Sequence, residues 1–386
     1  MKNEDAERTT NLVRIARKLL ASGGTLESGA PSGSLGEEQV LAALKNQILS
    51  RADILSEGGR DLTANVAADE VLAVAKSALT KTAAGAETSD LTGSEFAGLE
   101  AIIRLTGRPA MGYKGGQVET PSGIGENEHW QVFLALARAK INTASASIGR
   151  VELTGLGDVV LLGTAWRLGD DLVVTNRHVA RLLAANSTGP VSSWKLETTK
   201  GPRVDFGIAS VGGVPRMFSV TGISYCAPEP EIDLAILKLQ CNSIAAPPPL
   251  AVDMLPTSLG YEVTNTSAEG VGFKGGEIYV VGHPAGPSNS EAISSVFGKA
   301  DGSKRWSPGF VTRVESRYPV FEHDCSTLGG NSGSCVLTSA SHTVVGVHFG
   351  GRGVEPLTGV GRTNAALALS RIVDNKAGTI LKTGKI

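Results

Sequence analysis

The sequence predicts a multidomain protein with a small all-α N-terminal domain, an all-β sandwich or barrel region, and a C-terminal helix. Three observations lead to this fold class. Apolar residues recur at helical spacing within the first hundred residues. Farther along, short runs rich in β-branched and aromatic residues alternate with glycine, proline or polar turns. The chain has 386 residues, which is too long for one compact core.

Helical periodicity defines the N-terminal domain over residues 1–108. Residues 109–144 form a linker that ends in a connecting helix at Trp130–Ile141, and residues 145–386 form the second domain. Polar loops with glycine and serine separate the N-terminal helices. These helices are predicted to cover Leu12–Leu20, Gly36–Arg51, Ala67–Thr80 and Glu95–Leu105.

Turn-bounded apolar runs predict the strands of the second domain. The closing segment Ala365–Val373 returns to helical spacing and predicts the C-terminal helix. The predicted strands cover Ser147–Leu153, Val159–Trp166, Leu172–Thr175, Phe218–Ser224, Leu234–Leu239, Glu277–Val281, Gly309–Val314 and Val344–Phe349.

A glycine-flanked serine is the strongest functional signal in the sequence. Ser332 lies in the run Thr327-Leu-Gly-Gly-Asn-Ser-Gly-Ser334. A serine hydroxyl becomes an effective nucleophile only with a base to take its proton and N–H groups to hold the oxyanion. The glycines permit a sharp turn on which the N–H groups of Gly330 and Ser332 can converge. Alone, such a cluster would more often be a surface turn.

Two upstream residues supply the groups that this serine would need. His178 follows the apolar run Val173-Val174-Thr175 after two residues, and Asp233 stands in an otherwise apolar segment. A carboxylate in apolar surroundings needs a partner, and a histidine N–H is one. The order His, Asp, Ser, with separations of 55 and 99 residues, is that of the chymotrypsin-type triad. Asp205 is a rival for the acid role, at a less suitable spacing.

The segments Thr175–Val179, Ile232–Leu237 and Gly329–Ser334 resemble the three signature blocks of trypsin-like serine peptidases, in the bacterial branch that includes the glutamyl endopeptidases. The resemblance covers roughly residues 145–372. It implies a double β-barrel of two six-stranded antiparallel barrels with the active site between them.

The resemblance also assigns roles in a serine endopeptidase that works through an acyl-enzyme. His178 is the general base, Asp233 orients it, and Ser332 is the nucleophile. The N–H groups of Gly330 and Ser332 form the oxyanion hole, with Asn331 between them.

Glutamyl endopeptidases place a threonine and a histidine in the pocket for an acidic substrate side chain. Thr327 and His348 match these positions, and the alternative is that His348 only ends a core strand. Phe349, Gly350 and Gly351 are then expected to pair with the substrate backbone as an added strand. Cys335 departs from the usual proline, which should alter a turn rather than the chemistry. Secreted relatives use their mature amino terminus in this pocket, whereas here roughly 140 residues precede the barrel.

Composition narrows the partners to a protein or peptide substrate. A net charge of −2 gives no case for nucleic acid or an anionic membrane surface. The sequence has no signal peptide or membrane span, so a cytoplasmic location is expected. Its four cysteines lack zinc-site spacing and are expected to be reduced, and no metal or cofactor is expected.

Other functions stay open. The trypsin-like fold could serve as a pseudoprotease that only binds partners, although a complete triad argues against it. The same nucleophile could act on small acyl substrates, although no Gly-x-Ser-x-Gly elbow is present. The N-terminal domain could be an adaptor that binds a protein partner, an inhibitory pro-segment or a packing domain. Because a cytoplasmic endopeptidase needs restraint, we expect it to control or target the protease.

Overall fold

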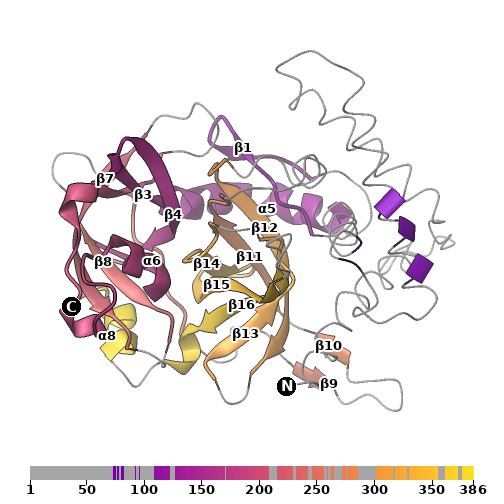
Figure 1. The fold of residues 1–386 in the computed structure, drawn as a ribbon. Helices are drawn as coiled ribbons and strands as arrows, with labels where there is room; N and C mark the ends of the chain where they lie inside the picture. The colour runs from indigo at the N-terminus through magenta and orange to yellow at the C-terminus, as the bar shows by residue number, and fades with distance from the viewer. Residues whose placement is uncertain are drawn as a thin grey trace, which may run out of the picture.

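Two closed β-barrels lie side by side in the computed structural model (Figure 1). The structure describes eight scattered residues between 73 and 95, and then the ranges 108–121, 127–169, 171–207, 215–228, 232–241, 246–255, 259, 262–264, 272–274, 276–285, 301–315, 318–327, 330–354, 361–372 and 376–386. Each barrel has six antiparallel strands, as the family resemblance implied.

The first barrel closes where its first strand pairs with its fourth, giving the order β3-β4-β5-β8-β7-β6. A short helix, α6 (Arg177–Leu183), follows β5 and covers the barrel with Val179 and Leu183. The strands are β3 (Ile148–Leu156), β4 (Asp158–Arg167), β5 (Leu172–Thr175), β6 (Pro202–Asp205), β7 (Met217–Cys226) and β8 (Ala235–Leu239). The 3₁₀ turns Val191–Ser193 and Thr198–Lys200 lie between α6 and β6.

The second barrel has the matching order β11-β12-β13-β16-β15-β14. Its strands are β11 (Glu277–Gly282), β12 (Arg305–Val314), β13 (Val320–His323), β14 (Cys335–Thr338), β15 (Val344–Val354) and β16 (Gly361–Ala368). Two hairpins form separate two-stranded sheets: β1 (Tyr113–Lys114) with β2 (Gln117–Val118), and β9 (Glu262–Thr264) with β10 (Gly272–Lys274).

The prediction of a helix at Ala365–Val373 is wrong. Ala365–Ala368 belongs to β16, and the 3₁₀ turn Leu369–Arg371 follows it. The apolar run has helical spacing, but β16 is paired on both sides, with β13 and β15, so that pairing within the barrel decides its conformation. The C-terminal helix is α8 (Lys376–Thr383), which buries Ile380 and Leu381.

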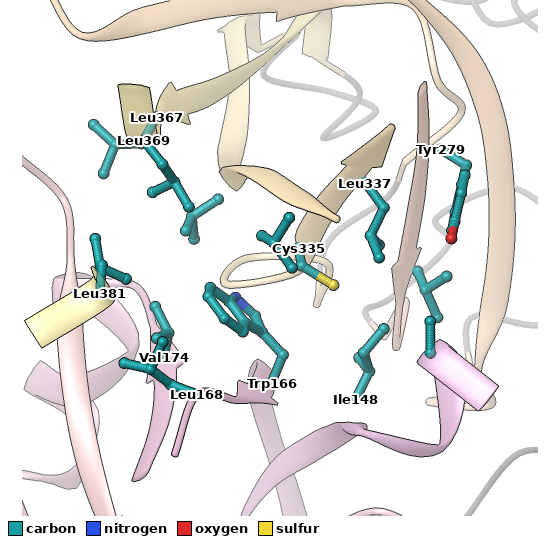
Figure 2. Packing of buried hydrophobic residues seen from close by; sticks show 14 of the residues in the cluster. Ile148, Trp166, Leu168, Val174, Tyr279, Cys335, Leu337, Leu367, Leu369 and Leu381 are labelled. Carbon is teal, nitrogen blue, oxygen red and sulfur yellow. The ribbon is translucent and has the colours of Figure 1, made fainter. Parts of the chain in front are cut away.

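The chain before the first barrel is part of the same core. Helix α5 (Asn127–Ala146) extends beyond the predicted Trp130–Ile141 at both ends. Its Trp130 is fully buried, as is Val118 from the hairpin before it. Both belong to the hydrophobic cluster that joins the barrels. Figure 2 shows the centre of this cluster, where Trp166 of the first barrel faces Cys335 of the second.

Only a few residues of the N-terminal helical prediction can be compared with the structure. Within Ala67–Thr80, the described residues, such as Ala73 and Ser77, are helical. Glu95 is helical and forms a capping box with Thr92, in which each side chain accepts a hydrogen bond from the other's backbone N–H. The remaining predicted helices lie outside the described residues. In the part of the chain that is described, no helix is long and apolar enough to cross a membrane.

Candidate active site

His178 and Asp233 meet at one end of the first barrel. His178 lies in the first turn of α6, just after β5, and Asp233 lies just before β8. Because β5 pairs with β8, the two residues are neighbours. The His178 Nδ1 is 2.6 Å from Asp233 Oδ2, and the His178 backbone N–H donates to Asp233 Oδ1 at 3.0 Å. An ionised carboxylate only accepts hydrogen bonds, so Nδ1 carries the hydrogen and Nε2 keeps its lone pair.

Asn176 and Arg177, which precede His178, hold the backbone around Asp233 in place. The buried Asn176 donates from Nδ2 to the backbone oxygen of Asp233 at 2.9 Å. Arg177 donates from Nη1 to the backbone oxygen of Ile232 at 2.7 Å. The loop that carries Asp233 is therefore held on both sides of its side chain. Asn176 and Arg177 belong to the histidine motif, but their partners could not be identified from the sequence.

Ser332 lies on the turn between β13 and β14 of the second barrel, and this turn is fastened to the first barrel by Thr164. The Thr164 N–H donates to the Ser332 oxygen at 2.8 Å. The Thr164 hydroxyl donates to the Gly330 oxygen at 3.0 Å and accepts the N–H of His283 at 3.1 Å. Thr164 is fully buried. A single threonine of β4 therefore fixes the carbonyl groups on both sides of Asn331.

The turn needs its glycines. Gly330 has φ +85° and Gly333 has φ +89°, both in the left-handed region that favours glycine. A Cβ on Gly333 would lie 2.1 Å from the Thr164 oxygen, so no larger residue fits there without a backbone shift.

The backbone N–H groups of this turn divide into two sets. Gly333 donates to the His348 oxygen at 2.8 Å, and Ser334 donates to the Asn331 oxygen at 2.9 Å. Within the described part of the chain, the N–H groups of Gly330 and Ser332 make no hydrogen bond. These two donors were predicted to form the oxyanion hole, and they are available for a ligand.

The serine turn packs against the helix that carries His178. A Cβ on Gly163 would lie 2.9 Å from the Ser332 oxygen and 2.8 Å from a methyl group of Val179, the residue after His178. Among the described residues, the hydrogen bonds of His178 join it to Asp233 and not to Ser332. A hydrogen bond between a serine nucleophile and its histidine base is often long without substrate and shortens in the Michaelis complex.

Asp205, the rival acid, has another task. It ends β6, and its Oδ1 accepts the N–H groups of Gly207 and Arg216, each at 2.8 Å. Asp205 thereby closes a loop of the first barrel, while the carboxylate that contacts His178 is that of Asp233.

His348 is paired with a second histidine that the sequence did not suggest. The two side chains lie on β15 and β13, and His323 Nε2 is 3.2 Å from His348 Nδ1. Both residues are 2% exposed. Burial lowers the pKa of His348 to about 3, and the nearby charge of His178 adds to this effect. Burial also lowers the pKa of His323 well below its ordinary value. Both rings are therefore neutral at pH 7.

Thr327 is positioned by Asn364 of β16. The Thr327 hydroxyl donates to Asn364 Oδ1 at 2.6 Å, and Asn364 Nδ2 donates to the Cys325 oxygen at 2.7 Å. Asn364 lies far along the chain from the serine motif. Only the strand pairing of β13 with β16 brings it there.

Beyond His348, strand β15 has one partner. Gly350 and Gly351 pair with β16, and the register shift between His348 and Gly350 leaves Phe349 as an extra residue. In the described residues, the pairing of β15 with β14 extends only to Val347. The other edge of Phe349–Gly351 is where the predicted substrate strand would add.

The described residues hold no group of histidines, cysteines or carboxylates suited to a metal ion. In the structure, which describes all four cysteines, none of them forms a disulfide, in agreement with the expectation that they are reduced: Cys226, Cys241, Cys325 and Cys335. Burial raises the pKa of Cys226 to about 12, so this thiol beside Asp233 stays protonated.

Comparison with known proteins agrees with this architecture. Residues 163–347 match the family model described as a trypsin-like peptidase domain. No curated protein sequence matches the chain. A serine endoprotease from Yersinia pestis has 14% identity and a TM-score of 0.39, over 64% of this chain and 66% of that one. The active form of the Rv3671c protease from M. tuberculosis has 18% identity and a TM-score of 0.38, over 66% and 87%.

The match to the family model runs from β4 to β15 and contains His178, Asp233 and Ser332. The chain spans 66% of the length of the Yersinia protease. Residues 163–347 are thus similar to a trypsin-like peptidase domain, and the two closed barrels agree with that similarity.

Proposed function

We propose that the protein is a serine endopeptidase in which His178, Asp233 and Ser332 form the catalytic triad and the reaction passes through an acyl-enzyme. The observation that carries this proposal is the double contact of Asp233 with the ring and backbone of His178, at 2.6 and 3.0 Å. It fixes the tautomer in which Nε2 can accept a proton.

In this mechanism His178 Nε2 takes the proton of the Ser332 hydroxyl as its oxygen attacks the scissile carbonyl. The resulting oxyanion accepts hydrogen bonds from the N–H groups of Gly330 and Ser332. His178 then gives its proton to the leaving amine, and the acyl-enzyme forms. Water, activated by the same histidine, hydrolyses this ester and frees Ser332. Asp233 stabilises the imidazolium at each stage.

We propose further that the enzyme prefers acidic residues at the position before the cleaved bond. Support comes from the buried pair His348–His323, because a protonated His348 would donate a hydrogen bond to a carboxylate. The Thr327 hydroxyl, which donates to Asn364 Oδ1 without substrate, would turn its hydrogen to the same carboxylate. Without substrate, the neutral rings avoid the cost of a buried charge. An arriving carboxylate would raise the pKa of His348, so that the ring and the substrate become a charge pair only together.

The N-terminal domain is proposed to control or target this activity in the cytoplasm, through a protein partner. A shortened chain should begin at Arg108, because Met111, Val118 and Trp130 are buried in the core of the barrels. We expect this chain to differ from the full-length protein in peptide hydrolysis or partner binding. Identical behaviour in both would contradict a regulatory role.

A fluorophosphonate probe tests the active serine directly. The full-length protein should be labelled, whereas Ser332→Ala and His178→Ala should not. The exposed Ser341 and the half-exposed His129 provide matched controls, and Ser341→Ala and His129→Ala should be labelled like the wild type. No labelling of a folded wild type would favour a pseudoprotease, and labelling without peptide cleavage would favour a small-substrate hydrolase.

Quenched peptides that differ only in Glu, Gln or Ala before the cleaved bond test the preference. Loss of one hydrogen bond to a charged group lowers kcat/KM by about 10- to 100-fold. His348→Gln should lower cleavage after Glu by this factor and leave cleavage after Ala nearly unchanged. Equal losses for both peptides would contradict the proposed pocket.

A further inference from the structure

The chain upstream of the protease domain is attached to the second barrel beside the proposed pocket. Arg108 and Pro109 are buried, and Met111 forms an isolated bridge with Trp306 of β12. The two residues exchange backbone hydrogen bonds of 2.8 and 2.9 Å. Residues 108–111 therefore have a fixed place on the barrel.

Arg108 makes a buried ion pair there. Its Nη2 lies 2.8 Å from Asp324 Oδ2, and the two side chains are 6% and 8% exposed. The guanidinium carbon also lies 4.8 Å from the ring centre of Phe310, whose N–H donates to the other oxygen of Asp324 at 2.7 Å. A planar guanidinium suits such a site better than a flexible ammonium, because it can pair and stack together.

Asp324 belongs to a five-residue segment, His323–Thr327, that we name the wall segment. Each of its residues has a fixed contact. His323 and Thr327 face His348 and Asn364, the backbone oxygen of Cys325 accepts from Asn364, and Asp324 pairs with Arg108. The hydroxyl of Ser326 donates to the Arg108 backbone oxygen at 2.7 Å. The wall segment is thus held from one side by β15 and β16 and from the other by Arg108.

We propose that Arg108 is a positioning residue for the specificity pocket: it holds the wall segment so that His323 and Thr327 keep their places beside His348 and Asn364. This rests on the proposed function of that pocket. Through Arg108, the chain before the barrels acts on substrate selection without touching the substrate. Such supporting contacts typically change affinity or activity about 10- to 100-fold when they are lost.

The test uses the full-length protein with Arg108→Met, the conservative Arg108→Lys and the double variant Arg108→Met/Asp324→Leu. The double variant guards against misfolding, because it leaves no unpaired buried charge. Arg138→Met is the matched control, since Arg138 fastens Val118 and Thr120 of the same upstream segment. The measurements are kcat/KM for the Glu and Ala peptides, the rate of fluorophosphonate labelling, and the ¹⁵N signals of the His323 and His348 rings.

Arg108→Met and the double variant should lower the ratio of Glu to Ala cleavage by about tenfold, mainly through KM. They should shift both imidazole signals and leave the labelling rate within about twofold of the wild type. Arg108→Lys keeps the charge but loses the stacking on Phe310, so it should retain only part of the ratio, and Arg138→Met should resemble the wild type.

Unchanged imidazole signals together with an unchanged cleavage profile would overturn the proposal. It would also be overturned if labelling and both peptides declined by the same factor, because Arg108 would then support the domain as a whole. A wild type that is labelled but shows no acidic preference would contradict the proposed pocket instead. The imidazole signals would still decide whether Arg108 holds the wall segment.

Discussion

The two barrels treat their histidines in opposite ways. In the first barrel, the side chain of His178 is 46% exposed, and its partner is a carboxylate. In the second barrel, His323 and His348 are 2% exposed, and they are paired with each other. A proton can therefore reach His178, whereas burial keeps the other two rings neutral. The difference agrees with the proposed roles, in which the first barrel transfers protons and the second recognises the substrate.

The largest effect is expected when the carboxylate that contacts His178 in the first barrel is removed. Asp233→Asn would turn an NH₂ donor toward Nδ1, favour the wrong tautomer of His178, and lower kcat by about 10⁴-fold. Asp205→Asn is the comparison, because it removes the rival carboxylate. We expect it to reduce stability but to leave kcat within about threefold, since the change lies outside the reacting groups. Peptide hydrolysis and thermal unfolding of both variants would measure this. A similar loss of kcat in Asp205→Asn would contradict the assignment.

The contact between the barrels offers a smaller effect. Thr164→Val keeps the shape of the side chain and the N–H bond to Ser332, but removes the hydroxyl bond to Gly330. The oxyanion donors would lose part of their orientation, so we expect kcat to fall about tenfold, less than for a lost donor, with KM nearly unchanged. Thr164→Ser should retain activity.

Thr221→Val serves as a control for the Thr164 variant, because the Thr221 hydroxyl bonds to Lys238 at an exposed site. Steady-state kinetics and the affinity of a peptide aldehyde would separate the two outcomes. An unchanged aldehyde affinity in Thr164→Val would show that the hydroxyl does not orient the oxyanion hole.

A further difference between the barrels concerns the stability of the second barrel in acid. Burial lowers the pKa of His283 to about 3, from 6.5 in an exposed histidine. The unfolded state therefore binds more protons between these values, and stability is lost as the pH falls from 6.5 toward 3. His283 would contribute at most about 1.4 kcal/mol per pH unit, and His323 and His348 act in the same direction. Urea unfolding at several pH values should show a shallower dependence in His283→Gln. An equal dependence would contradict this account.

The sequence predicted the parts of the fold that depend on local pattern. The strand runs Val159–Trp166 and Leu172–Thr175 agree closely with β4 and β5, because β-branched residues between turns indicate strands. The short strands β6, β13 and β14 were missed, since four residues give little periodicity. The apolar run at Ala365 was misjudged because helical spacing and a strand buried by pairing on both sides look alike in sequence.

Some residues of the candidate site could be predicted from local sequence motifs, and others could not. His178, Asp233 and Ser332 lie in motifs that can be recognised one at a time, and their joint role stays a prediction. Thr164, His323 and Asn364 could not be found, because their roles arise from strand pairing between distant segments. The contact of Arg108 with Ser326 spans 218 residues of sequence, and no local pattern points to it.

The helices at the two ends of the double barrel each pack on the barrel that lies farther away in sequence. Helix α5 precedes the first barrel but packs on the second, where Phe133 stacks on Trp306 and His129 pairs with Glu277. Helix α8 follows the second barrel but ends against the first, with Gly384 beside Gly169 (Figure 1). Each barrel is thus contacted by a helix that adjoins the other barrel in sequence. The pair should therefore melt as one cooperative unit, and the two barrels should not move apart about a hinge.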